Sequence, residues 1–124
     1  MRILLVEPDR LTAKEVASYL SQQHTVLHAV DAQAAIHTFD NQNIDAVVLE
    51  LVLPGHNGIE FLYEIRSYDD LQYVPVVVYT QTTTDQAEHQ QLTSQLGVRV
   101  ICYKGSTSLA QLSECLLELQ AAHQ

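Results

Sequence analysis

Basic residues are scarce in this chain of 124 residues, which has 6 Lys and Arg against 15 Asp and Glu and a formal net charge of −9. The few cations form no cluster, so we expect no electrostatic binding to nucleic acid or to an anionic membrane. No apolar run approaches the roughly 20 residues that a membrane-spanning helix needs. These absences exclude direct nucleic-acid binding and membrane spanning.

Cysteine is rare as well, with 2 residues in the chain. The spacing of Cys102 and Cys115 matches no metal or redox motif. Residues 1–6 are typical of a strand that leads into acidic residues, not of a signal peptide, which indicates a cytoplasmic protein. In that compartment we expect both cysteines to be reduced thiols, with Cys115 packed in the core.

Five short apolar runs alternate with five helical patterns. The runs predict strands at 2–7, 25–30, 45–50, 74–80 and 99–103, and the patterns predict helices near 10–22, 32–41, 58–68, 85–96 and 107–121. Gly97 is placed to end the fourth helix as a left-handed cap. Three helix starts carry the spacing of a capping box: Asn57 with Glu60, Asp85 with Glu88, and Ser108 with Gln111. No linker interrupts the pattern, so we predict one domain over residues 1–124.

Strands that alternate with helices pair in parallel through right-handed crossovers and give a three-layer α/β/α sandwich. The first, third and fourth strands are almost wholly apolar, as central strands are. The second contains His28 and the fifth Arg99, which suits edge positions. We therefore predict a five-stranded parallel sheet of order 2-1-3-4-5, with ligand groups where the first and third strands end.

The fourth helix is the weakest of the predicted elements. Between positions 85 and 96 its only apolar residues are Ala87, Leu92 and Leu96. So narrow a stripe gains little from burial and should open locally with ease. We favour a solvated surface helix over a partner-binding face.

Polar residues follow four of the five strands. The strand ends are Glu7-Pro8-Asp9, Glu50, Tyr79-Thr80-Gln81 and Tyr103-Lys104-Gly105. Each is weak evidence alone, because Asp9 could cap a helix and Lys104 could be a solvated charge. Parallel strands end at one edge of a sheet, so these groups should converge on one site.

At this point the chain resembles the receiver domains of two-component response regulators over essentially its whole length. The resemblance is carried by 3–6 (Ile-Leu-Leu-Val), 45–55, Gly58, 75–80 (Pro-Val-Val-Val-Tyr-Thr) and Tyr103-Lys104. It implies the flavodoxin-like fold predicted above and transfer of a phosphoryl group from a histidine kinase to an aspartate after the third strand. It also implies a magnesium ion held by that aspartate and two acids after the first strand, with Thr80 and Lys104 on the phosphoryl oxygens.

Several of the implied site residues differ from that pattern. Glu50 takes the place of the phosphoacceptor aspartate, and its extra methylene moves the carboxylate by roughly 1.5 Å, where shifts of about 1 Å already cost an in-line transfer heavily. The acid pair maps to Glu7 and Pro8, and proline offers no carboxylate. Losing one acid should weaken magnesium binding markedly, unless Asp9 reaches inward instead.

The readout positions differ as well. The family's Lys-Pro step, usually a cis peptide, is here Lys104-Gly105, so we expect another loop path, because a non-proline cis bond costs about 2.5–4 kcal/mol. The aromatic switch position is Ile101, while Tyr103 lies beside the lysine. Glu50 could form an ion pair with Lys104 that imitates the phosphorylated state, or it could be a solvated relic.

The leading hypothesis is a divergent receiver, a regulatory module and not an enzyme, that acts through protein–protein interaction without phosphorylation or a cofactor. Its partners would be a histidine kinase, an output domain or another regulator, or a second copy of the chain through the fourth helix, fifth strand and fifth helix. Candidate surface residues are Gln90, Gln91, Arg99, Tyr103 and Gln111. The alternative is a working phosphoacceptor that uses Glu50 or Asp9 with weak Mg²⁺ binding. A flavodoxin-like module for an anionic small ligand is disfavoured, because Glu7-Pro8-Asp9 would repel the ligand.

Overall fold

Five parallel strands form one sheet in the computed structural model of the chain, which describes residues 1–122. They are β1 (Arg2–Val6), β2 (Thr25–Ala29), β3 (Ala46–Leu49), β4 (Val76–Thr80) and β5 (Val98–Tyr103). Their order is β2-β1-β3-β4-β5, with every neighbouring pair parallel. The predicted topology is confirmed, including the edge positions of the second and fifth strands.

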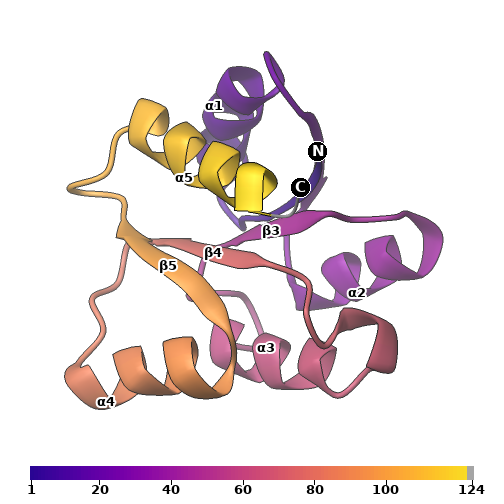
Figure 1. Cartoon of the computed structure of the whole chain (residues 1–124), viewed down its shortest axis with the longest axis vertical. Coiled ribbons are helices and arrows are strands. Elements are labelled where there is room, and N and C mark those ends of the chain that lie inside the picture. The colour runs from indigo at the N-terminus through magenta and orange to yellow at the C-terminus, as the bar shows by residue number, and fades with distance from the viewer. Residues whose placement is uncertain (123–124) are drawn as a thin grey trace.

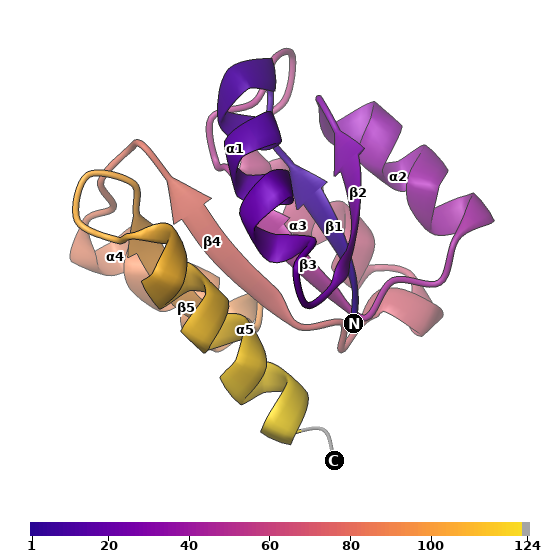
Figure 2. The same ribbon diagram turned by 90° about the horizontal axis from the view of Figure 1, so that it is seen from above.

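Helices cover both faces of the sheet (Figures 1 and 2). They are α1 (Arg10–Leu20), α2 (Ala32–Asn41), α3 (Gly58–Arg66), α4 (Gln86–Gln90) and α5 (Leu109–Ala122), with a short 3₁₀ turn η1 (Asp69–Leu71) after α3. One apolar layer packs under α1 and α5, and a second packs under α2, α3 and the end of the α4 region. The three-layer α/β/α sandwich is therefore confirmed.

Side-chain caps begin the helices, at the predicted Asn57, Asp85 and Ser108 and also at Asp9 and Asp31. The carboxylates or amides of Asp9, Asp31, Asn57 and Asp85 each accept a backbone N–H of the first turn. Ser108 forms a full reciprocal box, because its Oγ accepts from Gln111 N while its own N–H donates to the Gln111 side chain. These contacts satisfy donors that a helix start would otherwise leave open.

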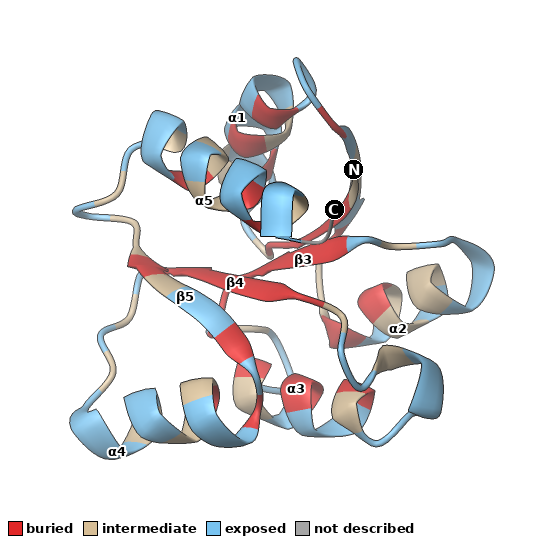
Figure 3. Cartoon of the chain, viewed as in Figure 1, coloured by how far each residue is buried: buried red, intermediate tan, exposed pale blue. Residues whose placement is uncertain are grey.

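The central strands are more deeply buried than the edge strands (Figure 3). Every residue of β3 and β4 is buried, whereas β2 and β5 carry exposed positions such as His28, Arg99 and Val100. Among the residues described, no helix has both the length and the apolarity to cross a membrane.

The fourth helix differs most from its prediction. It is α-helical only over Gln86–Gln90 and continues as a π-helical segment, η2 (Gln91–Gln95). The N–H of Leu96 reaches the carbonyl of Gln91, five residues back. Leu92 and Leu96 are both in the core, while Ala87, assigned to the apolar stripe, is exposed. Gly97 follows at φ +68°, the left-handed cap that was predicted.

Smaller differences concern the element ends. Helix α1 ends at Leu20, not at position 22, and α5 begins at Leu109, not at 107. The strands β1 and β3 end one residue early, so Glu7 and Glu50 lie just beyond them. That position matters, because a side chain past the last ladder residue can turn into the space above the sheet edge.

Candidate functional site

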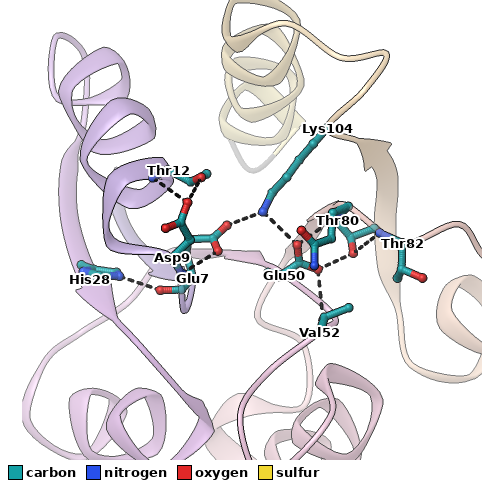
Figure 4. Close-up of polar contacts among 10 residues, drawn as sticks. Glu7, Asp9, Thr12, His28, Glu50, Val52, Thr80, Thr82 and Lys104 are labelled. Atoms are coloured by element: carbon teal, nitrogen blue, oxygen red, sulfur yellow. Dashed lines mark hydrogen bonds and ion pairs between the residues drawn. The ribbon is translucent and has the colours of Figure 1, made fainter.

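The ends of β1, β3, β4 and β5 bring four polar side chains into direct contact (Figure 4). They are Glu7, Glu50, Thr80 and Lys104, all predicted from the sequence to converge. Lys104 comes from the far side of the site and its Nζ lies between the two carboxylates, 2.6 Å from Glu7 Oε1 and 2.8 Å from Glu50 Oε1.

Glu50 is buried, with 2% of its surface exposed. Its Oε1 accepts from Lys104 Nζ and from the backbone N–H of Gln81 at 3.0 Å. Its Oε2 accepts from the N–H of Val52 at 3.0 Å and from the Thr80 hydroxyl. A carboxylate offers about four lone-pair sites, and Glu50 therefore has one donor for each of them. The interpretation of Glu50 as a solvated relic is wrong, and the ion pair with Lys104 is present.

Glu7 is also buried and hydrogen-bonded. Its side chain is 3% exposed, its Oε2 accepts from the N–H of Asp9 at 3.1 Å, and its backbone carbonyl contacts His28 Nε2 at 2.8 Å. Lys104 also lies over the ring of Tyr79, 5.8 Å from its centroid, within the range of a cation–π contact. The lysine is thus enclosed by two anions and an aromatic face.

The surroundings of Glu50 and Lys104 favour the charged form of each side chain. Burial would raise the pKa of Glu50, but the donors Lys104, Thr80, Val52 and Gln81 together outweigh it and lower that pKa below its ordinary value. Burial would likewise lower the pKa of Lys104, and the Glu50 and Glu7 carboxylates raise it instead. Carboxylate and ammonium are therefore both stabilised as ions.

Close backbone packing sets the position of Glu50. Helix α3 starts at Gly58, whose N–H donates to the carbonyl of Leu51 at 2.7 Å. A Cβ at position 58 would lie 2.8 Å from Leu51 Cα and 3.2 Å from Glu50 O, so only glycine permits this approach. The loop after β3 is pressed against α3, and the Glu50 side chain is directed towards β4 and β5.

The magnesium ion that the family implies does not fit these residues. Lys104 Nζ occupies the space between the Glu7 and Glu50 carboxylates, and Pro8 supplies no ligand. Asp9 caps α1 through Thr12 and does not reach inward. Within residues 1–122 no group of three or more His, Cys, Asp or Glu is placed to hold a metal ion. Magnesium needs several oxygen ligands in octahedral geometry, which this arrangement does not offer.

The readout positions are also rearranged. Ile101 packs against the apolar layer under α3 and α4. The Tyr103 hydroxyl hydrogen-bonds the Thr84 hydroxyl at 2.7 Å, which ties the end of β5 to the loop between β4 and α4. Among the described residues there is no cis peptide bond, so the Lys104–Gly105 loop takes the other path that was predicted.

The predicted surface residues divide into two groups. Gln90 and Arg99 are exposed, and their side chains form no hydrogen bond within residues 1–122. Gln91 donates to Tyr63, Tyr103 contacts Thr84, and Gln111 belongs to the Ser108 cap. The sequence did not predict the backbone donors Val52 and Gln81 or the contact with the ring of Tyr79. Neither the direction of a backbone N–H nor the position of an aromatic ring can be read from residue type.

The sequence profile of the response regulator receiver domain matches residues 3–113. This chain belongs to that family. The receiver is 32% identical over 87 residues to the regulatory protein VanRB of Enterococcus faecalis, an alignment that covers 69% of this chain and 38% of VanRB. It is 31% identical over 81 residues to the two-component response regulator PhoP of Pseudomonas aeruginosa, covering 64% of this chain and 35% of PhoP. The receiver thus spans little more than a third of these relatives.

Solved structures agree with the fold. A two-component response regulator from Clostridium difficile superposes with a TM-score of 0.85 at 20% identity, covering 98% of this chain and 96% of that one. The chemotaxis protein CheY4 of Vibrio cholerae gives a TM-score of 0.84 at 19% identity, covering 95% and 97%. Receivers of this family act in two-component signalling, where they interact with histidine kinases and output domains.

Proposed function

We propose that this receiver signals through protein–protein interaction without being phosphorylated, with the Glu50 carboxylate taking the place of an aspartyl phosphate. The supporting observation is the set of four donors on Glu50. In the pattern that the family resemblance implies, the hydroxyl at position 80 and the lysine at 104 contact phosphoryl oxygens. Here they contact the carboxylate itself.

The geometry disfavours transfer in two ways. A phosphoryl donor would have to displace Lys104, Thr80 and two backbone N–H groups from Glu50, each a charge-assisted hydrogen bond. Of the residues that follow β1, Glu7 alone has its carboxylate in the site, because position 8 is proline and the Asp9 carboxylate is engaged at the start of α1, so the acid pair that would hold a metal ion is incomplete. A carboxylate carries less charge than a phosphoryl group, but it fills the same set of donors.

The proposed output surface is α4 with η2, β5 and α5. Gln90 and Arg99 are exposed there, and the Tyr103–Thr84 bond links this surface to the strand ends. Either a partner protein or a second copy of the chain would bind it. The proposal includes a single receiver unit over residues 1–124, a location in the cytoplasm, and no enzymatic activity of its own.

The test is incubation with acetyl phosphate and Mg²⁺, or with a cognate kinase, followed by intact-mass measurement. We expect no stable phosphoryl adduct on the natural chain. Glu50→Asp shortens the side chain, and Pro8→Asp with Glu50→Asp also restores the second acid, so the double variant should gain one phosphoryl group. Asp9→Asn is the matched control for the alternative acceptor.

Two outcomes contradict the proposal. One is a stable phosphoryl group mapped to Glu50 in the natural chain, and the other is an adduct that Asp9→Asn removes. A Mg²⁺ titration followed by tyrosine fluorescence gives an independent measurement. Saturable binding by the natural chain would support the working phosphoacceptor, whereas saturation in the double variant alone supports the proposal.

A further inference from the structure

Cys102 and Cys115 come from different elements but lie in one packed layer. Cys102 pairs with Tyr79 across β5 and β4, and Cys115 is on α5. Both belong to the apolar layer between the sheet and the helices α1 and α5. Cys115 is among the groups that perturb the Cys102 thiol, so the two side chains are neighbours in this layer, although the turn from β5 into α5 separates them along the chain.

The two thiols differ in access to solvent. Cys102 is buried, with 7% of its surface exposed, while Cys115 is half-buried. Cys115 also lines a cavity of about 230 Å³ between β5 and α5, together with Arg99, Val100 and Glu118. A water molecule takes up about 30 Å³ of liquid, so a small solute such as a peroxide can enter this cavity and reach Cys115.

The chemistry of Cys102 also disfavours it as the first nucleophile. Burial, and then the neighbouring thiol of Cys115, raise the pKa of the Cys102 thiol to about 11. Cys102 therefore stays protonated at neutral pH and is a poor first nucleophile, since the thiolate is the reactive form. A reagent that arrives through the cavity meets Cys115 first.

We propose that Cys115 and Cys102 form an oxidisable dithiol whose substrate is a small hydroperoxide. The Cys115 sulfur attacks the outer peroxide oxygen, the O–O bond breaks, and an S–O bond forms. Sulfur loses two electrons to become the sulfenic acid, and the peroxide leaves as an alcohol or, from hydrogen peroxide, as water. Cys102 then attacks this sulfur, and its proton leaves with the hydroxyl group as a second water, so that an S–S bond remains.

The product ties β5 to α5, two of the elements that border the proposed output surface. It does not depend on the function proposed above, because neither sulfur contacts Glu50, Glu7 or Lys104 in the hydrogen bonds of that site. A disulfide limits the unfolded chain, so the oxidised protein should also unfold at a temperature several degrees higher than the reduced one.

The experiment treats the reduced chain with hydrogen peroxide, then denatures it, alkylates it with iodoacetamide and measures the intact mass. The chain has 2 cysteines, so the reduced protein takes two alkyl groups. After peroxide treatment we expect no alkyl group, because both sulfurs are in the disulfide, and a protein mass two hydrogens below that of the reduced chain. Dithiothreitol should restore both alkylation sites. Two alkyl groups after peroxide, sulfinic acid on Cys115 without a disulfide, or disulfides only between two chains would each overturn the proposal.

Single-cysteine variants test which thiol attacks the peroxide and which one completes the disulfide. In Cys102→Ser the sulfenic acid on Cys115 has no partner, so dimedone should label Cys115, and Cys115→Ser should leave Cys102 unlabelled. Circular dichroism checks that each variant is folded, with Cys102→Ala as the substitute for a poorly folded serine variant. Equal dimedone labelling of Cys102 in Cys115→Ser would contradict Cys115 as the attacking thiol. Peptide mapping of the oxidised natural chain locates the bond without any variant.

Discussion

The strand-end site and the α4 segment of this molecule are held in opposite ways. At the site, the buried Glu50 carboxylate has four donors and Lys104 pairs with both Glu50 and Glu7, while close packing at Gly58 fixes the loop that follows Glu50. The α4 segment has a short α-helical part, a π-helical part and mostly exposed polar side chains, with Leu92 and Leu96 as its buried anchors. Few buried contacts mean easier local opening, so we expect the α4 segment to open more easily than the site.

That contrast has a consequence for signalling. In a receiver that is switched by phosphorylation, the site must have two states. Under the proposed function, one arrangement satisfies Glu50 without any added group, and we expect the variable part to be the α4 segment. Arg66 links this segment to the connection between α3 and β4, because its guanidinium donates to the carbonyl of Leu96 and to those of Leu71 and Val74. Binding at the output surface would then select among states of α4 and leave the site unchanged.

The largest effect is expected from Lys104→Met. It removes the only cation between Glu7 and Glu50 within the described residues and leaves two buried carboxylates facing each other. Breaking a buried ion pair on one side costs about 3–5 kcal/mol, measurable as a lower urea midpoint at pH 7. The matched control is Lys14→Met on exposed α1, which should change little. Adding Glu50→Gln should restore part of the loss, and no recovery would contradict the role of charge.

A smaller loss is expected from Thr80→Val. The substitution keeps the shape of the side chain but removes the hydroxyl that donates to Glu50 Oε2 and accepts from the N–H of Thr82. Leaving a buried charged acceptor with one donor fewer costs about 1–3 kcal/mol. Thr83→Val in the exposed loop is the control. Equal unfolding midpoints for the two variants would show that the Thr80 contact contributes nothing.

A gradual effect is expected from pH. The pKa of Glu50 is lowered in the folded chain, so its contribution to stability is complete above the ordinary value of 4.5 and is lost as pH falls through the folded value. The pKa of Lys104 is raised, so its contribution is complete below 10.5 and is lost as pH rises through the folded value. Glu50→Gln should flatten the acid limb of the stability profile, and an unchanged acid limb would contradict the assignment.

The smallest effect is expected in the α4 segment. The exposed Tyr63 hydroxyl accepts from Gln91 Nε2 at 2.8 Å and contacts Gln95. Tyr63→Phe should change the free energy of unfolding by no more than about 0.5 kcal/mol. Hydrogen exchange should nevertheless quicken at the amides of η2 and remain slow in β3 and β4. Faster exchange in all of these elements together would mean that α4 does not open by itself.

Much of the fold could be predicted from the sequence because its signals are local. Apolar runs on both faces mark β3 and β4, and the caps Asn57, Asp85 and Ser108 begin helices where their spacing requires. The π-helical segment could not be predicted. Leu92 and Leu96, four residues apart, would share one face of an ordinary α-helix as well, so the hydrophobic pattern predicts both core positions but does not distinguish the wider turn.

The candidate site was only partly predictable for a related reason. Residue type and order named Glu7, Glu50, Thr80 and Lys104 as neighbours, because parallel strands end at one edge. Whether Glu50 was solvated or paired stayed open in the sequence, since it depends on a difference of a few ångströms in side-chain reach. Tyr79 and the N–H groups of Val52 and Gln81 decide the matter.

The sequence by itself determined the alternation of strands and helices, the strand order and the identity of the groups at the strand ends, because hydrophobic period and chain connectivity are written along the chain. Only the tertiary structure decided that Lys104 lies between two buried carboxylates, that the Asp9 carboxylate caps α1, and that Cys102 and Cys115 lie in one packed layer. These are arrangements of residues far apart in sequence, and the packing of the helices on the sheet determines them.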